Sequence, residues 1–193
     1  VMKLSRHAAT MLWAFCALVV APTVAWSLDV LHDYEPERFE VHEIITGLTQ
    51  PMELDRGPDG EIYLIELGGV LKRIDPATGQ SEEIGRLEVT TAQENGLIGL
   101  ALDPNFATNR WIYLQYSPPE FSGQHISRFT LVDGKLDLAS EKILFTYEEQ
   151  RRECCHHAGS LEFGPDGTLY IGTGDNTNPF DDSQGYAPID QRK

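Results

Sequence analysis

The sequence predicts an all-β fold of the β-propeller type, here as an incomplete piece of about three to four blades. The chain has 11 prolines and 17 glycines in 193 residues, and its apolar runs are short, which is unlike a helical bundle. An apolar segment, a Pro-Asp or Pro-Asn turn and a second segment centred on tyrosine recur three times. A repeat of roughly 40–60 residues that forms a small antiparallel sheet is typical of propellers. An open β-sandwich with coincidental turns is the alternative.

The three copies are predicted hairpins. Proline fixes φ at the first corner of each turn, and Asp-Gly or Asn tolerates the following corners, so the flanking segments can pair. Across residues 62–65 the side chains should alternate between the two faces of a strand. The copies run MELDRGPDGEIYLIELGG from Met52, LIGLALDPNFATNRWIYLQYS from Leu97 and LEFGPDGTLYIGTGD from Leu161, with turns at Pro58, Pro104 and Pro165.

Further strands are expected between the copies. Residues 70–80 read as a strand followed by a turn, and residues 125–147 as a hairpin closed at Asp133-Gly134. A propeller closes only with about four to eight blades. We therefore expect the chain to be the N-terminal piece of a longer protein, or the product of a truncated reading frame.

The first 26 residues have the pattern of a signal peptide. Lys3 and Arg6 precede a long apolar stretch, and small residues follow near positions 24–27. The expected division is a signal peptide at 1–26, an N-terminal linker at 27–40 and a partial propeller at 41–193. The protein should then be exported to the periplasm or the extracellular space, with an uncleaved membrane anchor as the alternative.

The charge of the chain excludes some partners. Lys and Arg number 15 against 30 Asp and Glu, which gives a formal net charge of −15. Such a chain repels phosphate backbones and anionic membrane surfaces, so no nucleic-acid partner is expected.

Two cysteines and two histidines stand together at residues 154–157. In an extended segment neighbouring side chains point to opposite faces, so at most two of these residues could serve one metal ion. The spacing also differs from haem-attachment and zinc-ribbon motifs. Cys154 and Cys155 would either form a strained vicinal disulfide or have no redox role. The side chain of His157 is expected to pack between blades or to bond to the backbone.

Two segments carry a resemblance to a known family: ENGLIGLALDPNFATNRWIYLQYS and HHAGSLEFGPDGTLYIGTGD. Over about residues 40–190 the chain resembles the soluble quinoprotein sugar dehydrogenases, the glucose/sorbosone dehydrogenase family. The resemblance implies a six-bladed propeller that uses pyrroloquinoline quinone (PQQ) and calcium. Such an enzyme oxidises a sugar or related alcohol by hydride transfer to PQQ and then reduces an electron acceptor.

The same resemblance assigns site residues. His156 would be the general base that takes the proton of the sugar hydroxyl, and Asp175 would orient its imidazole. Glu94, beside Asn95, would contact the substrate. Cys155 stands where the better-known glucose enzymes have aspartate, which puts glucose itself in doubt as the substrate.

The sequence gives less support to a calcium site in this chain and to other classes of enzyme. Residues 175–182 offer oxygen donors but lack the order of an EF-hand, so a surface loop is expected there, with a calcium site as the alternative. By the resemblance, most ligands of the cofactor and its calcium lie beyond residue 193. Motifs of nicotinamide enzymes, serine hydrolases and zincins are absent from the sequence. The rival hypothesis is a non-catalytic propeller that binds carbohydrate or protein.

Overall fold

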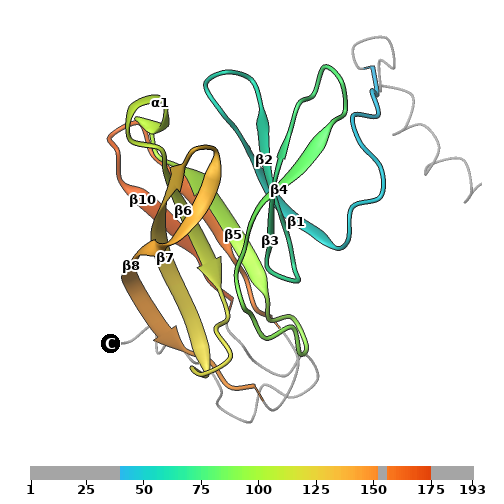
Figure 1. Cartoon of the computed structure of the whole chain (residues 1–193). Coiled ribbons are helices and arrows are strands. Elements are labelled where there is room, and N and C mark those ends of the chain that lie inside the picture. Colours follow the sequence, from blue (N-terminus) through green and yellow to red (C-terminus); the bar gives the residue numbers. More distant parts are fainter. Residues whose placement is uncertain (1–39, 152–155, 175–193) are drawn as a thin grey trace, which may run out of the picture. The chain divides into compact units, whose positions relative to one another are not determined.

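The computed structural model describes residues 40–151 and 156–174 (Figure 1). The chain divides into two units, residues 1–42 and 43–193, and only residues 40–42 of the first are described, without helix or strand. The predicted signal peptide and nearly all of the predicted linker thus lie outside the described residues. Among the described residues, no helix has the length and apolar character needed to cross a membrane.

The first sheet is a four-stranded antiparallel meander, β1-β2-β3-β4. The predicted Gly-Pro-Asp-Gly turn joins its first two strands, and Gly60 (φ 92°) donates its N–H to the Gly57 carbonyl at 3.0 Å. Glycine adopts this positive φ without strain, so the turn reverses the chain tightly. The strands are β1 (Pro51–Arg56), β2 (Ile62–Glu66), β3 (Val70–Ile74) and β4 (Ser81–Arg86).

The second sheet repeats this order as β5-β6-β7-β8. The predicted hairpin at Asp133-Gly134 is confirmed, and both turn residues have positive φ, 50° and 77°. After Pro104 the plain turn that we predicted is replaced by the short helix α1 (Phe106–Asn109), whose apolar Phe106 is buried. The strands are β5 (Leu97–Leu102), β6 (Trp111–Tyr116), β7 (Gly123–Val132) and β8 (Lys135–Glu148).

The third sheet is described only as the hairpin of β9 (Ser160–Phe163) and β10 (Leu169–Gly172). Each of the three predicted copies therefore forms the first two strands of a sheet. The all-β prediction is confirmed, and successive antiparallel meanders are the form that propeller blades take.

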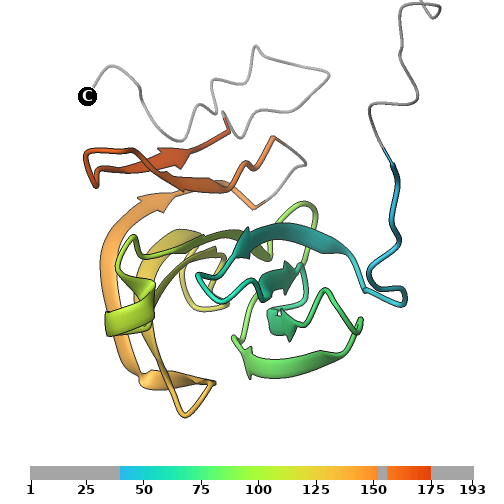
Figure 2. The ribbon, with the colours of Figure 1, turned by 90° about the horizontal axis from the view of Figure 1, so that it is seen from above.

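The first strands of the three sheets lie side by side (Figure 2): β1 contacts β5, and β5 contacts β9. Strand β5 is the edge of its sheet, so some of its N–H groups have no partner there. Glu53 accepts the N–H of Leu100 at 2.7 Å, and Asp55 accepts the N–H of Leu102 at 2.8 Å. Carboxylates of the first sheet thus accept hydrogen bonds from backbone N–H groups at the edge of the second sheet and hold β1 against β5.

The main hydrophobic core lies between the first and second sheets. It contains Ile65, Leu71, Leu100, Leu114 and Phe129, all almost fully buried. Tyr63 and Ile65 belong to this core whereas Ile62 and Leu64 do not, as the predicted alternation of residues 62–65 requires. Both faces of β2 are nevertheless covered, which explains its nearly continuous apolar sequence.

Candidate functional site

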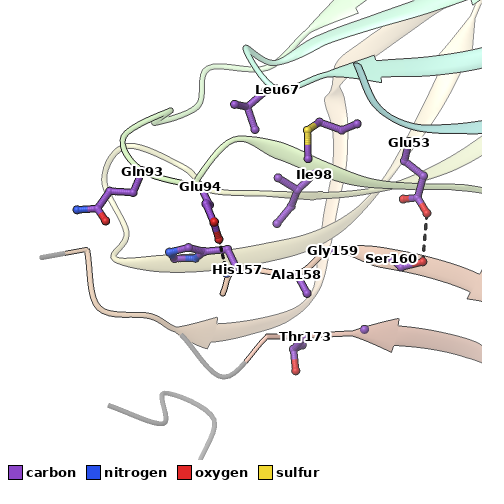
Figure 3. Close-up of a pocket in the computed structure, with 12 residues that line it drawn as sticks. Glu53, Leu67, Gln93, Glu94, Ile98, His157, Ala158, Gly159, Ser160 and Thr173 are labelled. Carbon is purple, nitrogen blue, oxygen red and sulfur yellow. Dashed lines mark hydrogen bonds between the residues drawn. The ribbon is translucent and has the colours of Figure 1, made fainter. Parts of the chain in front are cut away.

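A cavity of about 650 Å³ opens where the three first strands and their adjoining loops meet (Figure 3). Glu53 and Ile98 line it from strands, while Gln93 and Glu94 line it from the loop before β5. Residues 157–159 of the loop that leads into β9 supply a further wall. Glu94, which the sequence predicted to contact substrate, is thus brought to the wall of a cavity.

Three hydrogen bonds fix this loop to the neighbouring sheets. The His157 N–H donates to Glu94 Oε2 at 3.1 Å, and Ser160 Oγ donates to Glu53 Oε1 at 3.2 Å (Figure 3). Gln115 Nε2 donates to the Ala158 carbonyl at 3.0 Å. The wall is therefore held through side chains that come from both other sheets.

His156 directly precedes His157 in this loop, is exposed and is not among the residues that line the cavity. Its φ of 62° lies in the left-handed region, which is uncommon for a residue other than glycine. The backbone of Gly174 lies so close to the His156 carbonyl that a β-carbon at Gly174 would overlap it. Asp175, Cys154 and Cys155 lie outside the described residues, so the assignments of His156 as base and Asp175 as its partner stay predictions.

The side chain of Asn95 contacts the protein backbone. Its side chain is buried, and Nδ2 donates to the Ala92 carbonyl at 2.8 Å. Asn95 is not among the residues that line the cavity. The amide therefore shapes the loop that carries Glu94, and a direct contact with substrate stays a prediction.

His157, expected to pack between blades, has a buried side chain with a specific partner. Its Nδ1 lies 2.9 Å from Oε2 of Glu149, and both side chains are 0% exposed. Because a carboxylate only accepts hydrogen bonds, Nδ1 is the donor in this pair. The sequence did not indicate Glu149, which is one of two adjacent glutamates at the end of a strand and carries no motif.

The Glu149 carboxylate belongs to a larger buried network. Gln124 Nε2 donates to Glu149 Oε2 at 2.8 Å and lies 2.7 Å from Ser117 Oγ, which accepts the N–H of Gly96 at 3.2 Å. Burial and the adjacent Glu149 charge raise the pKa of Tyr147. The network links the end of β8 to the loop before β5 and to the loop before β9.

Glu53 has an unusual electrostatic environment. Burial is the main reason that its pKa is raised above 4.5, and the nearby charges of Asp55 and Glu162 act in the same direction. The hydrogen bonds from Leu100 and Ser160 oppose this change. The described wall of the cavity contains Glu53 and Glu94 but no lysine or arginine.

These groups can accept protons and bind hydroxyl groups. The carboxylates of Glu53 and Glu94 can accept hydrogen bonds from a polyhydroxylated ligand, and an imidazole next to the cavity is a group of the kind that accepts protons in catalysis. Within residues 40–151 and 156–174, no cluster of three or more His, Cys, Asp or Glu side chains could hold a metal ion.

Comparison with solved structures identifies the fold. The PQQ-bound form of an aldose sugar dehydrogenase from Streptomyces coelicolor is 28% identical in sequence, with a TM-score of 0.64. The match covers 72% of this chain and 42% of that one. The fold is therefore an incomplete β-propeller, as the sequence predicted.

Two curated relatives match a similar region. Quinoprotein glucose dehydrogenase B from Acinetobacter calcoaceticus is 28% identical over 149 residues, which cover 72% of this chain and 31% of the relative. The human hedgehog-interacting protein is 27% identical over 166 residues, which cover 76% and 23% of the two chains. The chain thus spans less than half the length of either relative.

The profile of one family, described as Glucose / Sorbosone dehydrogenase, matches residues 48–188. These residues include all three sheets, the loop that carries Glu94 and the loop that carries His156. The resemblance seen in the sequence is confirmed, and the chain belongs to the glucose/sorbosone dehydrogenase family.

Proposed function

We propose that the protein is a PQQ-dependent oxidoreductase that oxidises a sugar or related alcohol at the cavity between the three sheets. The observation that carries this proposal is the segment of residues 157–159, which forms a wall of the cavity and directly follows the exposed His156. Membership of the family and the likeness to a PQQ-bound aldose sugar dehydrogenase support the same chemistry.

In the proposed reaction His156 takes the proton of the substrate hydroxyl as a hydride leaves the carbon that bears this hydroxyl. Imidazole suits this step because it titrates near neutral pH. Asp175 would hold the imidazole in the required tautomer and stabilise its charged form. Glu94, which lies next to this loop and accepts the N–H of His157, would also accept a hydrogen bond from a sugar hydroxyl and orient the ring.

PQQ, when bound, supplies the two-electron acceptor for the hydride. The described residues fit the substrate side of such a site: a cavity of about 650 Å³ with an apolar part at Ile98 and Ala158 and polar groups at Glu53 and Glu94. No lysine or arginine lines the described wall, so this part of the chain assigns no partner to the carboxylates of PQQ. Calcium is part of the proposal through the family resemblance.

The cellular setting is proposed from the N-terminal sequence. A positively charged start, an apolar stretch and small residues near position 26 support export to the periplasm or beyond the cell. A sugar or alcohol from outside the cell would then be the substrate, and an electron acceptor in the same compartment would reoxidise the cofactor.

The test is dye reduction by the complete gene product that contains this chain, with PQQ and calcium added and a panel of aldoses and alcohols as substrates. His156→Ala should lower kcat by about 10²–10⁴-fold, the usual contribution of a general base. His42→Ala is the matched control, because His42 is exposed and belongs to the other unit of the chain.

Unchanged turnover in His156→Ala would remove His156 from the role of base. Sugar binding by calorimetry without any binding of PQQ would instead support the non-catalytic propeller.

A further inference from the structure

We propose that His157 and Glu149 form a loop anchor, a buried pair that positions the adjacent His156 for proton transfer. His156 and His157 would then divide their roles, one acting on substrate and the other holding the loop. This inference rests on the proposed function only for the catalytic part of its test, since the anchor itself is a property of the protein without cofactor.

The His157–Glu149 pair is removed from water. Both side chains are 0% exposed, and Nδ1 of His157 lies 2.9 Å from Oε2 of Glu149. A carboxylate removed from water is costly unless it is paired and hydrogen-bonded. Gln124 donates a second hydrogen bond to the same oxygen at 2.8 Å, so the acid is held in one position. A carboxylate fixed in this way also fixes the orientation of the imidazole that it binds.

The two partners come from different sheets. Glu149 follows β8, the last strand of the second sheet, and His157 belongs to the loop that enters the third sheet. Arg151 fixes the chain next to Glu149, because its guanidinium donates to the carbonyls of Pro118 and Gly123 at 2.8 and 3.0 Å. The loop anchor therefore ties the entrance of one sheet to a firmly held point on another.

His156 itself is restrained by its neighbours. The His157 N–H donates to Glu94, and the Gly174 backbone lies against the His156 carbonyl. With His157 held on one side and Gly174 on the other, His156 keeps a φ of 62° that few residues adopt. Loss of the His157 side chain would release one side of this restraint, and a misplacement of about 1 Å can cost 10²-fold in rate.

The experiment compares variants of the complete gene product in two measurements. Amide hydrogen exchange without cofactor reports the order of residues 157–160, and steady-state kinetics with PQQ and calcium report kcat and KM. His157→Ala should make the backbone amide at position 157 exchange about tenfold faster, since the loop opens locally. It should also lower kcat by about 10²-fold with little change in KM, because binding groups such as Glu94 remain.

Two further variants separate positioning from folding. His157→Asn should restore most of the exchange protection and of kcat, because its amide can donate from nearly the position of Nδ1. Glu149→Gln keeps the size of the side chain, removes its charge and should give an intermediate loss in both measurements. Tyr113→Phe is the control, because it removes a hydrogen bond of the same sheet that has no part in the loop.

Equal exchange and equal kcat in His157→Ala and the wild type would overturn the loop anchor. So would a loss in which His157→Asn is as impaired as His157→Ala, since the donor would then have no role. If the wild type shows no PQQ-dependent turnover at all, the proposed function fails, and the exchange data still decide whether the pair holds the loop.

Discussion

The two boundaries between consecutive sheets are built differently. Between the first and second sheets the contact is mainly apolar: Ile65 and Leu100 are almost fully buried, and the rings of Tyr63 and Phe106 meet edge-to-face at 5.2 Å. Such burial is non-directional and scales with the area removed from water. This boundary contributes chiefly to stability.

Between the second and third sheets the contact divides into two parts. One part is a small apolar cluster, in which Leu161 is buried and Tyr113 meets Phe163 edge-to-face at 5.0 Å. The other part, beside the cavity, is the polar network around Glu149 and His157. Hydrogen bonds depend on angle and distance, so this boundary is suited to setting the position of a loop.

Stability and positioning are therefore carried by separate contacts. Substitutions in the apolar boundary should lower the free energy of unfolding and leave the folded fraction catalytically intact. Substitutions beside the cavity should lower turnover more than stability.

The largest effect on stability is expected for Leu100→Ala. Leu100 is 1% exposed in the main core, and such a truncation costs about 2–5 kcal/mol of unfolding free energy through lost transfer energy and the cavity left behind. Urea denaturation measures the loss. Leu138→Ala is the control, since Leu138 is exposed and should change stability by no more than about 0.5 kcal/mol. A similar loss of unfolding free energy in both variants would contradict a stabilising apolar contact between the first and second sheets.

The next largest effect is expected for Gly174→Ala. An added methyl group would overlap the His156 carbonyl, so the loop must shift, and a shift of about 1 Å can lower kcat by 10²-fold. The activity assay of the complete gene product measures this. Gly68→Ala is the matched control, because a β-carbon at Gly68 meets no atom within 4 Å. Full activity of Gly174→Ala would mean that His156 does not depend on this contact.

The repeats and turns could be predicted from the sequence because they depend on neighbouring residues. Proline restricts φ and glycine permits positive φ within the four residues of a turn. The turn after β1 and the hairpin at Asp133-Gly134 could therefore be predicted from neighbouring residues. The helix α1 was missed, since a Pro-Asn pair also fits a plain turn. The sequence also did not single out β4, whose exposed charged residues show no apolar alternation.

The polar contacts of the site could not be predicted in the same way. Glu53 meets Leu100 from 47 positions away in sequence, and Glu94 meets His157 from 63. The sequence does not distinguish these two glutamates from surface glutamates, because their partners become neighbours only in the folded chain. Family resemblance supplied Glu94 and His156, whereas Glu149 required the structure.

A smaller, pH-dependent effect is expected for Glu53→Gln. The raised pKa of Glu53 means that folding favours its protonated form, so its contribution to stability is present below the unfolded value near 4.5 and is lost as pH rises through the folded pKa. The glutamine variant lacks this loss and should gain stability relative to the wild type as pH rises from about 4 to 7. Urea denaturation across that range measures it, with the exposed Glu88→Gln as control. A parallel pH profile in Glu53→Gln and the wild type would contradict the raised pKa.

The smallest effect is expected for Tyr113→Phe. Tyr113 Oη donates to Asp103 at 2.9 Å, and burial, together with this bond, raises the pKa of Tyr113 to about 12. The phenylalanine keeps the ring packed against Phe163, and Asp103 retains the donors of Asn105 and Asn109 at 2.8 Å. The loss should therefore be about 0.5–1.5 kcal/mol in urea denaturation, with unchanged kcat. If kcat fell as far as in Gly174→Ala, the apolar part of this boundary would also position the loop, and the separation between stabilising and positioning contacts would not hold.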